Sequence, residues 1–328
     1  MRRPHRQQRQ PGATPPAPAG VTVHMESSRV QVDVAVIGGS YAGLAASLQL
    51  ARARRSVAVV DAGVRRNRFA SASHGLIGQD GRAPGAIAEA ARSDVRAYPT
   101  VQWFDGTAEH AVAADDGFRI EVDGGRVVLA RRVVLAPGVV DTLPEIDGLA
   151  ARWGTSVFHC PYCHGYELDR GRIGVIATSP ASYHQAMLLP DWGPVTLFTN
   201  GVFAPDAAQQ AELSARGVVI EPARITRVID HATVALADGR QVVLDGLFTA
   251  THTHIATPLP AELGCAFDEG PLGKFIRTDA LKATTVPGVF ACGDAARGAG
   301  SVSLAIGDGA QAGMSVHRSL LFGTWSVA

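Results

Sequence analysis

One stretch near the amino end restricts the possible folds of this chain more than any other. A mostly apolar run over 32–37 indicates a buried parallel strand. It is followed by the turn Gly38-Gly39-Ser40-Tyr41-Ala42-Gly43, a helical pattern over 44–51, and a second strand over 57–60 that ends in Asp61. This order predicts a βαβ unit that binds a dinucleotide, with the pyrophosphate at the helix N-terminus. Asp61 lies 18 residues beyond Gly43, close to the roughly 20 residues typical of a ribose-binding acid.

The residues of this turn fit that role with one departure. Gly38 permits the tight turn and Gly43 lets helix and strand approach, but Ser40 stands where a second glycine is usual. The site is retained because the serine side chain is small and its hydroxyl can donate to a phosphate. Arg66 either binds adenosine phosphates or lies in a solvated loop, and His74 either faces the cofactor or caps its own loop. The predicted contacts in this half are Gly38, Gly39, Ser40, Tyr41, Ala42, Gly43, Asp61, Ala62 and Arg66.

The other half of the dinucleotide site lies far along the chain. A strand over 132–136 ends at Gly138, a strand over 286–292 ends in Gly293-Asp294, and a helix follows from Ser301. An acid at a strand end can accept hydrogen bonds from the ribityl hydroxyls of a flavin, and a helix N-terminus can stabilise negative charge on the reduced ring. The predicted contacts here are Gly138, Gly293, Asp294, Ser303, Leu304 and Ala305.

One domain is therefore expected to be built from both ends of the chain. We predict an α/β protein of two Rossmann-like three-layer domains. The cofactor domain is discontinuous, over 30–145 and 252–328, and a smaller domain over 146–251 is inserted into it. Residues 1–28 are basic and rich in Gln, Pro and Ala without an apolar run, so we expect a disordered extension rather than a secretory signal.

Composition excludes several classes of function. The formal net charge of zero argues against nucleic-acid binding and against an anionic membrane surface. No apolar run reaches the roughly 18 residues of a membrane span, and four cysteines in 328 residues are too few for a disulfide scaffold. A cytoplasmic location is the default expectation.

Two of the four cysteines form the motif His159-Cys160-Pro161-Tyr162-Cys163-His164. A C-x-x-C pair is a zinc half-site, a structural pair or a redox dithiol. Zinc needs two more ligands, and the flanking histidines are too close along the chain to complete a tetrahedron easily. Cys265 and Cys292 form no second pair, so no metal is expected. A redox dithiol is favoured because the chain also offers a flavin site.

The chain resembles the thioredoxin reductase-like flavoproteins from about Gln31 to Gly323. The motifs that carry the resemblance are the turn Gly38–Gly43, Cys160-Pro161-Tyr162-Cys163 and Phe290-Ala291-Cys292-Gly293-Asp294. The resemblance implies FAD as cofactor, a homodimer, Cys163 facing the flavin, and Cys160 exchanging with substrate. His164 stands where thioredoxin reductases have an aspartate. With Gly165-Tyr166-Glu167 behind it, the motif is most similar to the gliotoxin- and holomycin-type dithiol oxidases, which pass electrons through FAD to oxygen.

The inserted domain lacks the expected second nucleotide turn. In thioredoxin reductases the strand corresponding to 171–176 leads into a G-x-G-x-x-A turn that binds NADPH. Here the turn is Ala177-Thr178-Ser179-Pro180-Ala181-Ser182, whose Cβ atoms would obstruct a pyrophosphate. The next strand, over 195–198, ends in Thr199-Asn200-Gly201, with neither the arginines of an NADPH site nor the acid of an NADH site. NAD(P)H binding is therefore doubtful.

These observations predict an FAD-dependent dithiol:disulfide oxidoreductase that oxidises a small dithiol, with oxygen as acceptor. The expected catalytic residues are Cys160, Cys163, His164 and His159, where either histidine could instead be an ordinary loop residue. An NAD(P)H-dependent disulfide reductase, with a thioredoxin-like protein as partner, is the first alternative. A redox sensor that binds FAD without turnover is the second.

Overall fold

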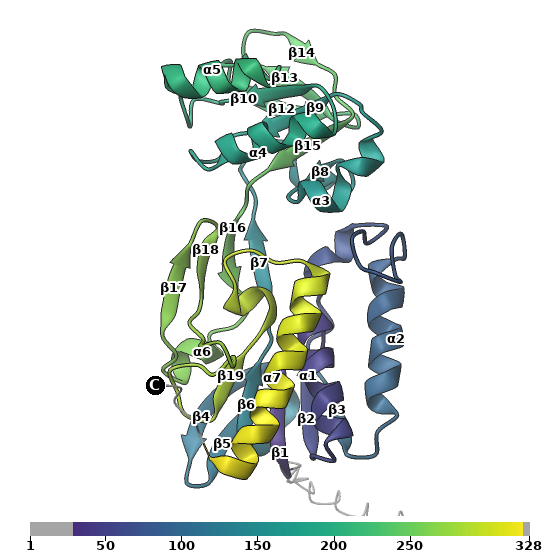
Figure 1. Ribbon diagram of the computed structural model, residues 1–328, viewed down its shortest axis with the longest axis vertical. Coiled ribbons are helices and arrows are strands. Elements are labelled where there is room, and N and C mark those ends of the chain that lie inside the picture. Colours follow the sequence, from purple (N-terminus) through teal and green to yellow (C-terminus); the bar gives the residue numbers. More distant parts are fainter. Residues whose placement is uncertain (1–28, 324–328) are drawn as a thin grey trace, which may run out of the picture.

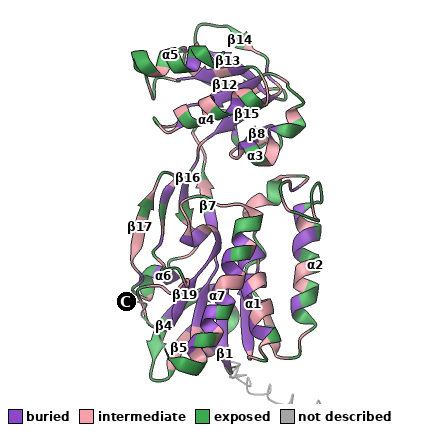
Figure 2. Ribbon diagram, in the orientation of Figure 1, coloured by how far each residue is buried: buried purple, intermediate pink, exposed green. Residues whose placement is uncertain are grey.

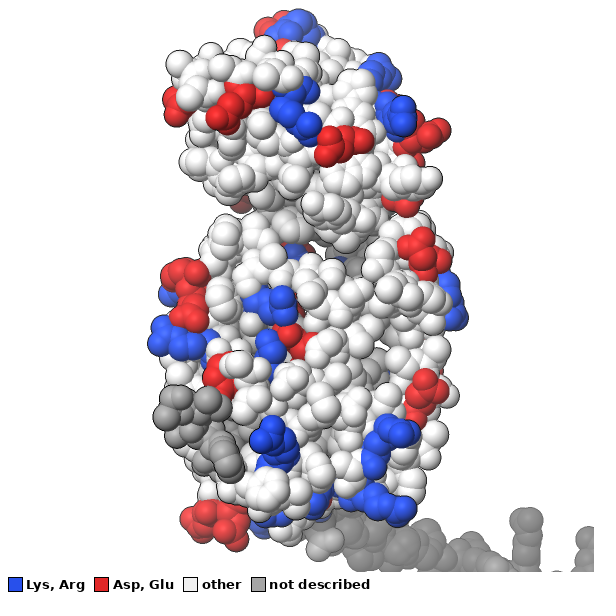
Figure 3. Space-filling model, in the orientation of Figure 1, with Lys and Arg blue, Asp and Glu red and all other residues white. Residues whose placement is uncertain are grey.

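The computed structural model describes residues 29–323, so the predicted extension over 1–28 lies outside the described residues. Two lobes stand one above the other and are joined by two neighbouring strands (Figure 1). Buried residues concentrate in the central strands of both lobes (Figure 2). Charges of both signs are scattered over the face shown in Figure 3, in agreement with the zero formal net charge.

The larger lobe is built on a seven-stranded sheet of order β3-β2-β1-β6-β5-β4, with β19 beside β6. Strands β1, β2, β3 and β19 run parallel to their neighbours, and β4, β5 and β6 pair antiparallel with one another. The pairing of β19 with β6 joins the two ends of the chain in one sheet. The strands are β1 (Arg29–Ile37), β2 (Val57–Asp61), β3 (Val101–Asp105), β4 (Ala108–Ala114), β5 (Gly117–Val122), β6 (Arg126–Leu135) and β19 (Val289–Ala291).

Alternate residues of β1 pack on the two opposite faces of the sheet. Val34 and Val36 pack beneath the helices α1 (Tyr41–Arg52), α2 (Pro84–Arg96) and α7 (Val302–Phe322). Ala35 and Ile37 pack on the other side, among residues of β5, α6 (Leu259–Glu262) and β18 (Gly273–Ile276). β18 pairs with β17 (Phe267–Gly270). A strand buried on both faces needs a continuous apolar run, which the sequence supplies.

The smaller lobe has a five-stranded parallel sheet of order β11-β10-β9-β15-β8. α4 and α5 pack on one face, and the antiparallel strands β12, β13 and β14 cover the other. The bounds are β8 (Val157–Phe158), α3 (Pro161–His164), β9 (Ile173–Ile176), α4 (Ser182–Leu188), β10 (Val195–Phe198), α5 (Ala207–Ala215), β11 (Val219–Glu221), β12 (Ile225–Ile229), β13 (Thr233–Leu236), β14 (Gln241–Val242) and β15 (Gly246–Thr249).

The crossing between the lobes is a pair of antiparallel strands, β7 (Val139–Thr142) and β16 (His252–Ile255). Thr142 lies opposite His252, so the chain leaves and re-enters the larger lobe at one place. The predicted two-domain α/β fold with an inserted smaller domain is confirmed. Of the helices between residues 29 and 323, none combines the length and apolarity that crossing a bilayer requires.

Candidate active site

The first half of the dinucleotide site is a cradle of glycines against neighbouring backbone. Gly38 has φ +99°, and a Cβ there would lie 2.2 Å from the carbonyl oxygen of Ala136. A Cβ on Gly43 would lie 1.8 Å from the carbonyl oxygen of Gly38. Both positions therefore require glycine. Ser40 is the extended N-cap residue of α1 and its hydroxyl makes no capping bond, which leaves the hydroxyl free for a phosphate.

The carboxylate of Asp61 is held in place from two sides. Its Oδ1 accepts the amide of Gly39 at 3.0 Å, and its Oδ2 accepts Arg92 Nη2 at 2.9 Å. Arg92 lies on α2, 31 residues away, and no local pattern points to it. Ala62 follows Asp61 at an exposed position.

The second half of the site comes from the carboxyl end of the chain. Gly293 has φ +72°, and a Cβ there would lie 2.8 Å from the Ala42 Cβ in the first turn of α1. Gly138 has φ +70° with open space where a Cβ would lie. Gly293 and Asp294 belong to the 3₁₀ helix η6 (Gly293–Ala296). The structure thus brings the two predicted halves together across the start of α1.

The N-terminus of α7 completes this side of the site. Ser301 caps the helix by accepting the amide of Leu304 at 3.3 Å. The hydroxyl of Ser303 donates to the carbonyl oxygen of Gly75 at 3.0 Å, which ties α7 to the loop that carries His74. Leu304 is exposed and Ala305 is buried. The glycine turn at the start of α1 fits the pyrophosphate of FAD, the strand-end acids fit its ribose and ribityl hydroxyls, and the N-terminus of α7 fits negative charge on the reduced ring.

The dithiol is oxidised and lies at the start of a short helix. Cys160 and Cys163 form a disulfide with a Cα–Cα distance of 5.3 Å. Cys160 is the N-cap of α3, Pro161 is its first residue, and the amide of Cys163 donates to the Cys160 carbonyl oxygen at 3.2 Å. Gly165 has no room for a side chain, because a Cβ would lie 2.8 Å from the ring of Trp192.

Comparisons with known proteins identify the family to which a chain with this flavin cradle and disulfide belongs. The model of the pyridine nucleotide-disulphide oxidoreductase family matches residues 32–309. The chain belongs to this family. The predicted thioredoxin reductase-like character, the cofactor FAD and flavin-dependent chemistry on sulfur are confirmed. Relatives of this kind act on disulfide or dithiol substrates.

Three relatives show how far the similarity extends. Thioredoxin reductase sirT of Leptosphaeria maculans is 31% identical, over 88% of this chain and 94% of its own. Thioredoxin reductase tcpT of Claviceps purpurea is 31% identical, over 90% and 96%. The crystal structure of an oxidoreductase from Agrobacterium tumefaciens has a TM-score of 0.87 and 57% identity, and the match covers 89% of this chain and 99% of that one.

In this disulfide oxidoreductase two imidazoles flank the disulfide in different surroundings. The ring of His164 stacks on Phe158 with centroids 4.3 Å apart. Burial lowers the pKa of His164, although nearby Glu167 acts in the opposite direction. Burial and then the charge of Arg66 lower the pKa of His159, whose Nδ1 is buried without a hydrogen-bond partner among the described residues. Both rings are therefore favoured in the neutral form, which can accept a proton.

His74 contacts the dithiol segment of the other lobe. Its Nδ1 lies 3.3 Å from Glu167 Oε1, in the 3₁₀ helix η4 (Tyr166–Leu168), and 3.7 Å from Asp80 Oδ1. The sequence left open whether His74 faces the cofactor or caps its loop. The structure places it between its own loop and the dithiol segment.

The degenerate second turn of the family fold is closed by its own side chains. The amide of Thr178 donates to Ser182 Oγ at 3.1 Å, and the amide of Ala181 donates to Ser179 Oγ at 3.2 Å. Thr178 Oγ1 donates to the Ala250 carbonyl oxygen at 2.8 Å, and Ser182 is fully buried. Two backbone amides of this turn are thus bonded within the turn itself.

One residue near this turn was missed by the sequence reasoning. At the end of β10, a Cβ on Gly201 would lie 3.0 Å from Arg224 Nη2. Arg224 therefore lies where an arginine for a 2′-phosphate is expected. It comes from the segment after β11, 23 residues beyond Gly201 in the chain, so no local pattern could reveal it.

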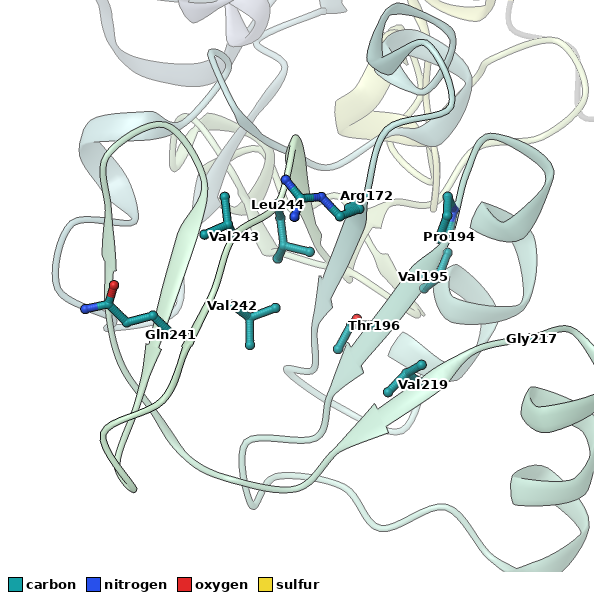
Figure 4. A pocket seen from close by; sticks show the side chains of 10 residues that line it. All are labelled: Arg172, Pro194, Val195, Thr196, Gly217, Val219, Gln241, Val242, Val243 and Leu244. Carbon is teal, nitrogen blue, oxygen red and sulfur yellow. The ribbon is translucent and has the colours of Figure 1, made fainter.

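A groove of about 490 Å³ in the smaller lobe lies away from all these residues. It runs between the parallel sheet and strand β14 (Figure 4), with Val195, Val219 and Val242 among its lining residues. Val195 and Val219 are the first residues of β10 and β11. Ligands of open α/β sheets bind at the carboxyl ends of the strands, so this groove at the amino ends receives no role. Within residues 29–323, no cluster of three or more His, Cys, Asp or Glu could hold a metal ion.

Proposed function

We propose that this flavoprotein oxidises a small dithiol to a disulfide and passes the electrons through FAD to oxygen, without a pyridine nucleotide. The observation that carries the proposal is the turn 177–182, which has no glycine and in which Ser182 and Ser179 accept the amides of Thr178 and Ala181. The flavin cradle, by contrast, keeps Gly38 and Gly43, and the Cys160–Cys163 disulfide is formed. This combination supports electron entry at the dithiol rather than at the second nucleotide site.

The first half of the proposed reaction is thiol–disulfide exchange. One substrate thiolate attacks Cys160 Sγ, which breaks the Cys160–Cys163 bond and leaves Cys163 as a thiolate. The second substrate thiol then attacks the mixed disulfide, releases the oxidised substrate and leaves Cys160 reduced. Two electrons and two protons leave the substrate.

The neutral histidines provide acceptors for these protons. His164, whose pKa is lowered by burial, is assigned as the base that deprotonates the attacking thiol. His159, which directly precedes Cys160 in the chain, is assigned as the acceptor of the second substrate proton when Cys160 leaves as a thiolate. FAD, when bound, supplies the two-electron acceptor that re-forms the disulfide and delivers the electrons to oxygen.

The residues that would hold FAD are the predicted contacts other than Arg66, whose guanidinium bonds to Asp141 and Asp294. Gly38 to Gly43 would take the pyrophosphate, Asp61 and Ala62 the adenosine ribose, and Asp294 the ribityl chain. Gly138, Gly293 and the start of α7 at Ser303, Leu304 and Ala305 would lie along the ring. We also propose the domain limits 30–145 with 252–328 and 146–251, and a homodimer, which sedimentation equilibrium would test.

An anaerobic stopped-flow comparison tests the proposed direction. Dithiothreitol should reduce the bound flavin rapidly, and NADPH or NADH should not. The variant Cys163→Ser should keep FAD but lose turnover by several orders of magnitude, because no intramolecular disulfide can re-form. Rapid reduction by NADPH together with no reduction by small dithiols would contradict the proposal.

Rapid reduction by NADPH without reduction by small dithiols would favour the alternative function, an NAD(P)H-dependent disulfide reductase. Arg224 beside Gly201 is the observation in its favour, as are the thioredoxin reductase names of the relatives sirT and tcpT. Binding of FAD without turnover by either reductant would leave the redox sensor.

A further inference from the structure

A cluster of ionic contacts around Arg66 joins three distant segments of the chain. Its Nε and Nη2 donate to the two carboxylate oxygens of Asp141 at 2.8 and 2.6 Å, and its Nη1 donates to Asp294 Oδ2 at 2.8 Å. Asp141 lies on the crossing strand β7, and Asp294 follows β19 at the predicted ribityl contact. One guanidinium therefore bonds to the crossing strand and to the cofactor side at once.

The second crossing segment belongs to the same cluster. Thr251, which directly precedes β16, donates its hydroxyl to Asp141 Oδ1 at 2.6 Å. Asp141 is thus shared between Arg66 and the return segment. Its side chain is only 7% exposed and that of Arg66 only 25%, so the bonds are largely shielded from water, and partly buried charged bonds of this kind are strong.

Hydrogen bonds and opposite charges keep the cluster ionised against the effect of burial. Burial alone would raise the pKa of Asp141, but the hydrogen bond and charge of Arg66 hold it below its ordinary value. Against the opposing effect of burial, the two carboxylates raise the pKa of Arg66. Asp141 and Asp294 bond to Arg66, and the charge of Arg66 also acts on the imidazole of His159 beside the disulfide.

The short element that carries Arg66 is also fixed to both lobes. It is the 3₁₀ helix η1 (Arg66–Phe69). Asn67 Nδ2 donates to the hydroxyl of Tyr41, the first residue of α1, at 3.2 Å. At the other end, Phe69 lies against Gly154 of the inserted lobe, where a Cβ would come within 2.6 Å of the Phe69 Cβ. η1 therefore contacts the flavin cradle on one side and the dithiol-bearing lobe on the other.

We propose that Arg66 is a positioning residue that fixes the distance between the dithiol and the flavin, by tying the cofactor-side Asp294 to both crossing segments through Asp141. The guanidinium acts through these carboxylates and touches neither sulfur. Oδ1 of Asp294 receives no bond from Arg66 and stays available to a ribityl hydroxyl. The inference rests on the proposed electron transfer between Cys163 and FAD.

The test compares Arg66→Met and Asp141→Asn with wild-type holoprotein. Anaerobic single-turnover reduction of the flavin by dithiothreitol measures the transfer, and titration measures the Kd for FAD. Both variants should retain FAD and show a transfer rate lowered by about 10- to 100-fold, since small misplacements of reacting groups have effects of this size. The KM for the dithiol should stay within about twofold, because exchange at Cys160 does not depend on the flavin distance.

Two further variants separate positioning from a general loss of structure. The double variant should be no slower than the slower single variant, because both changes remove one shared contact. Arg66→Lys should recover part of the rate through a single ionic contact. Arg68→Met is the matched control, since Arg68 lies in the same 3₁₀ helix, stacks on Phe69 and, among residues 29–323, bonds only to the carbonyl oxygen of Arg65. The control should have wild-type transfer.

The outcomes are distinguishable. An unchanged transfer rate in Arg66→Met overturns the inference. The inference is also overturned if Arg66→Met binds FAD more weakly and saturating FAD restores the full transfer rate, because Arg66 would then bind the cofactor itself. If Arg66→Met fails to fold, Thr251→Val and Asp141→Asn decide the matter by the same criteria.

A wild-type flavin that no dithiol reduces contradicts the proposed function, whatever Arg66 does. The comparison then starts from chemically reduced flavin and follows electron transfer to the Cys160–Cys163 disulfide. The same fall in rate supports the role of Arg66, and equal rates overturn it.

Discussion

The two histidines beside the disulfide, His159 and His164, lie five residues apart but in different environments. His164 is stacked on Phe158, while His159 is buried near the charge of Arg66. Burial is the largest cause of the lowered pKa in both. A histidine that stays neutral below its ordinary pKa of about 6.5 remains a proton acceptor in mildly acidic solution.

The pH profile of thiol–disulfide exchange should reveal His164. Because burial lowers its pKa, the neutral base persists below pH 6.5, and kcat/KM referred to total substrate thiol should fall through loss of this base only at more acidic pH. In His164→Gln the rate should be lower and should follow the thiolate concentration throughout, without a separate acid limb. Phe158→Ala should move the limb toward 6.5 by exposing the ring to water. An acid limb that is identical in wild type and His164→Gln would assign it to another group.

At the scale of elements, the contact between α1 and α7 supports the flavin cradle. Gly309 and Gly313 of α7 face α1, and a Cβ on Gly309 would lie 2.0 Å from the carbonyl oxygen of Ala42. Ala42 is also the residue against which Gly293 packs. The first turn of α1, which carries the predicted pyrophosphate contacts, is therefore held by glycines more than 250 residues away.

Two glycine substitutions in α7 should have opposite effects. Gly309→Ala should lower the free energy of unfolding by about 1–3 kcal/mol through overpacking, and should weaken FAD binding by displacing Ala42. Gly307→Ala meets nothing within 4 Å and should raise stability by up to about 1 kcal/mol, the ordinary helix preference for alanine. Urea unfolding and FAD titration measure both. Equal effects of the two substitutions would show that the close contact is not maintained in solution.

At the scale of the whole molecule, the two crossing strands β7 and β16 connect the two lobes. Because Thr142 and His252 lie opposite each other in an antiparallel pair, the larger lobe can be closed by a short turn in place of the inserted lobe. A chain of residues 30–142 joined to 252–323 through Asn-Gly should fold and bind FAD. Its flavin should not be reduced by dithiothreitol at the rate of the full chain, since Cys160 and Cys163 are gone.

Circular dichroism and FAD titration check the shortened chain. A folded chain that cannot bind FAD would place part of the cofactor site in the inserted lobe and would contradict the proposed domain limits. The full chain with Cys163→Ser is the control, because it also lacks the dithiol relay but retains both lobes.

Much of the first βαβ unit was predictable within a few residues. The predicted strands 32–37 and 57–60 correspond to β1 and β2. α1 begins at Tyr41 rather than Leu44, because the last residues of the glycine turn are already helical. These features depend on neighbours close in the chain: apolar runs for strands and glycines for positive φ or close approach.

The partners of the charged residues were not predictable. Arg92 reaches Asp61 over 31 residues, and Arg66 reaches Asp141 over 75 and Asp294 over 228. Arg66 was recognised as a candidate only through its place after the ribose acid. A long charged side chain has many partners of suitable chemistry, and only the arrangement of the strands selects among them.

The sequence by itself determined the cofactor class, the discontinuous domain and the redox dithiol, because each rests on a short motif whose residue types are constrained by local geometry. Only the tertiary structure decided that the amides of the second turn are bonded to Ser179 and Ser182, and that Arg66 links the flavin side to both crossing segments. The bonds to Ser179 and Ser182 span only two and four residues, but several hydroxyls in this turn could accept them, and the folded turn selects between them. The bonds of Arg66 exist only once the two lobes and the strands between them are assembled.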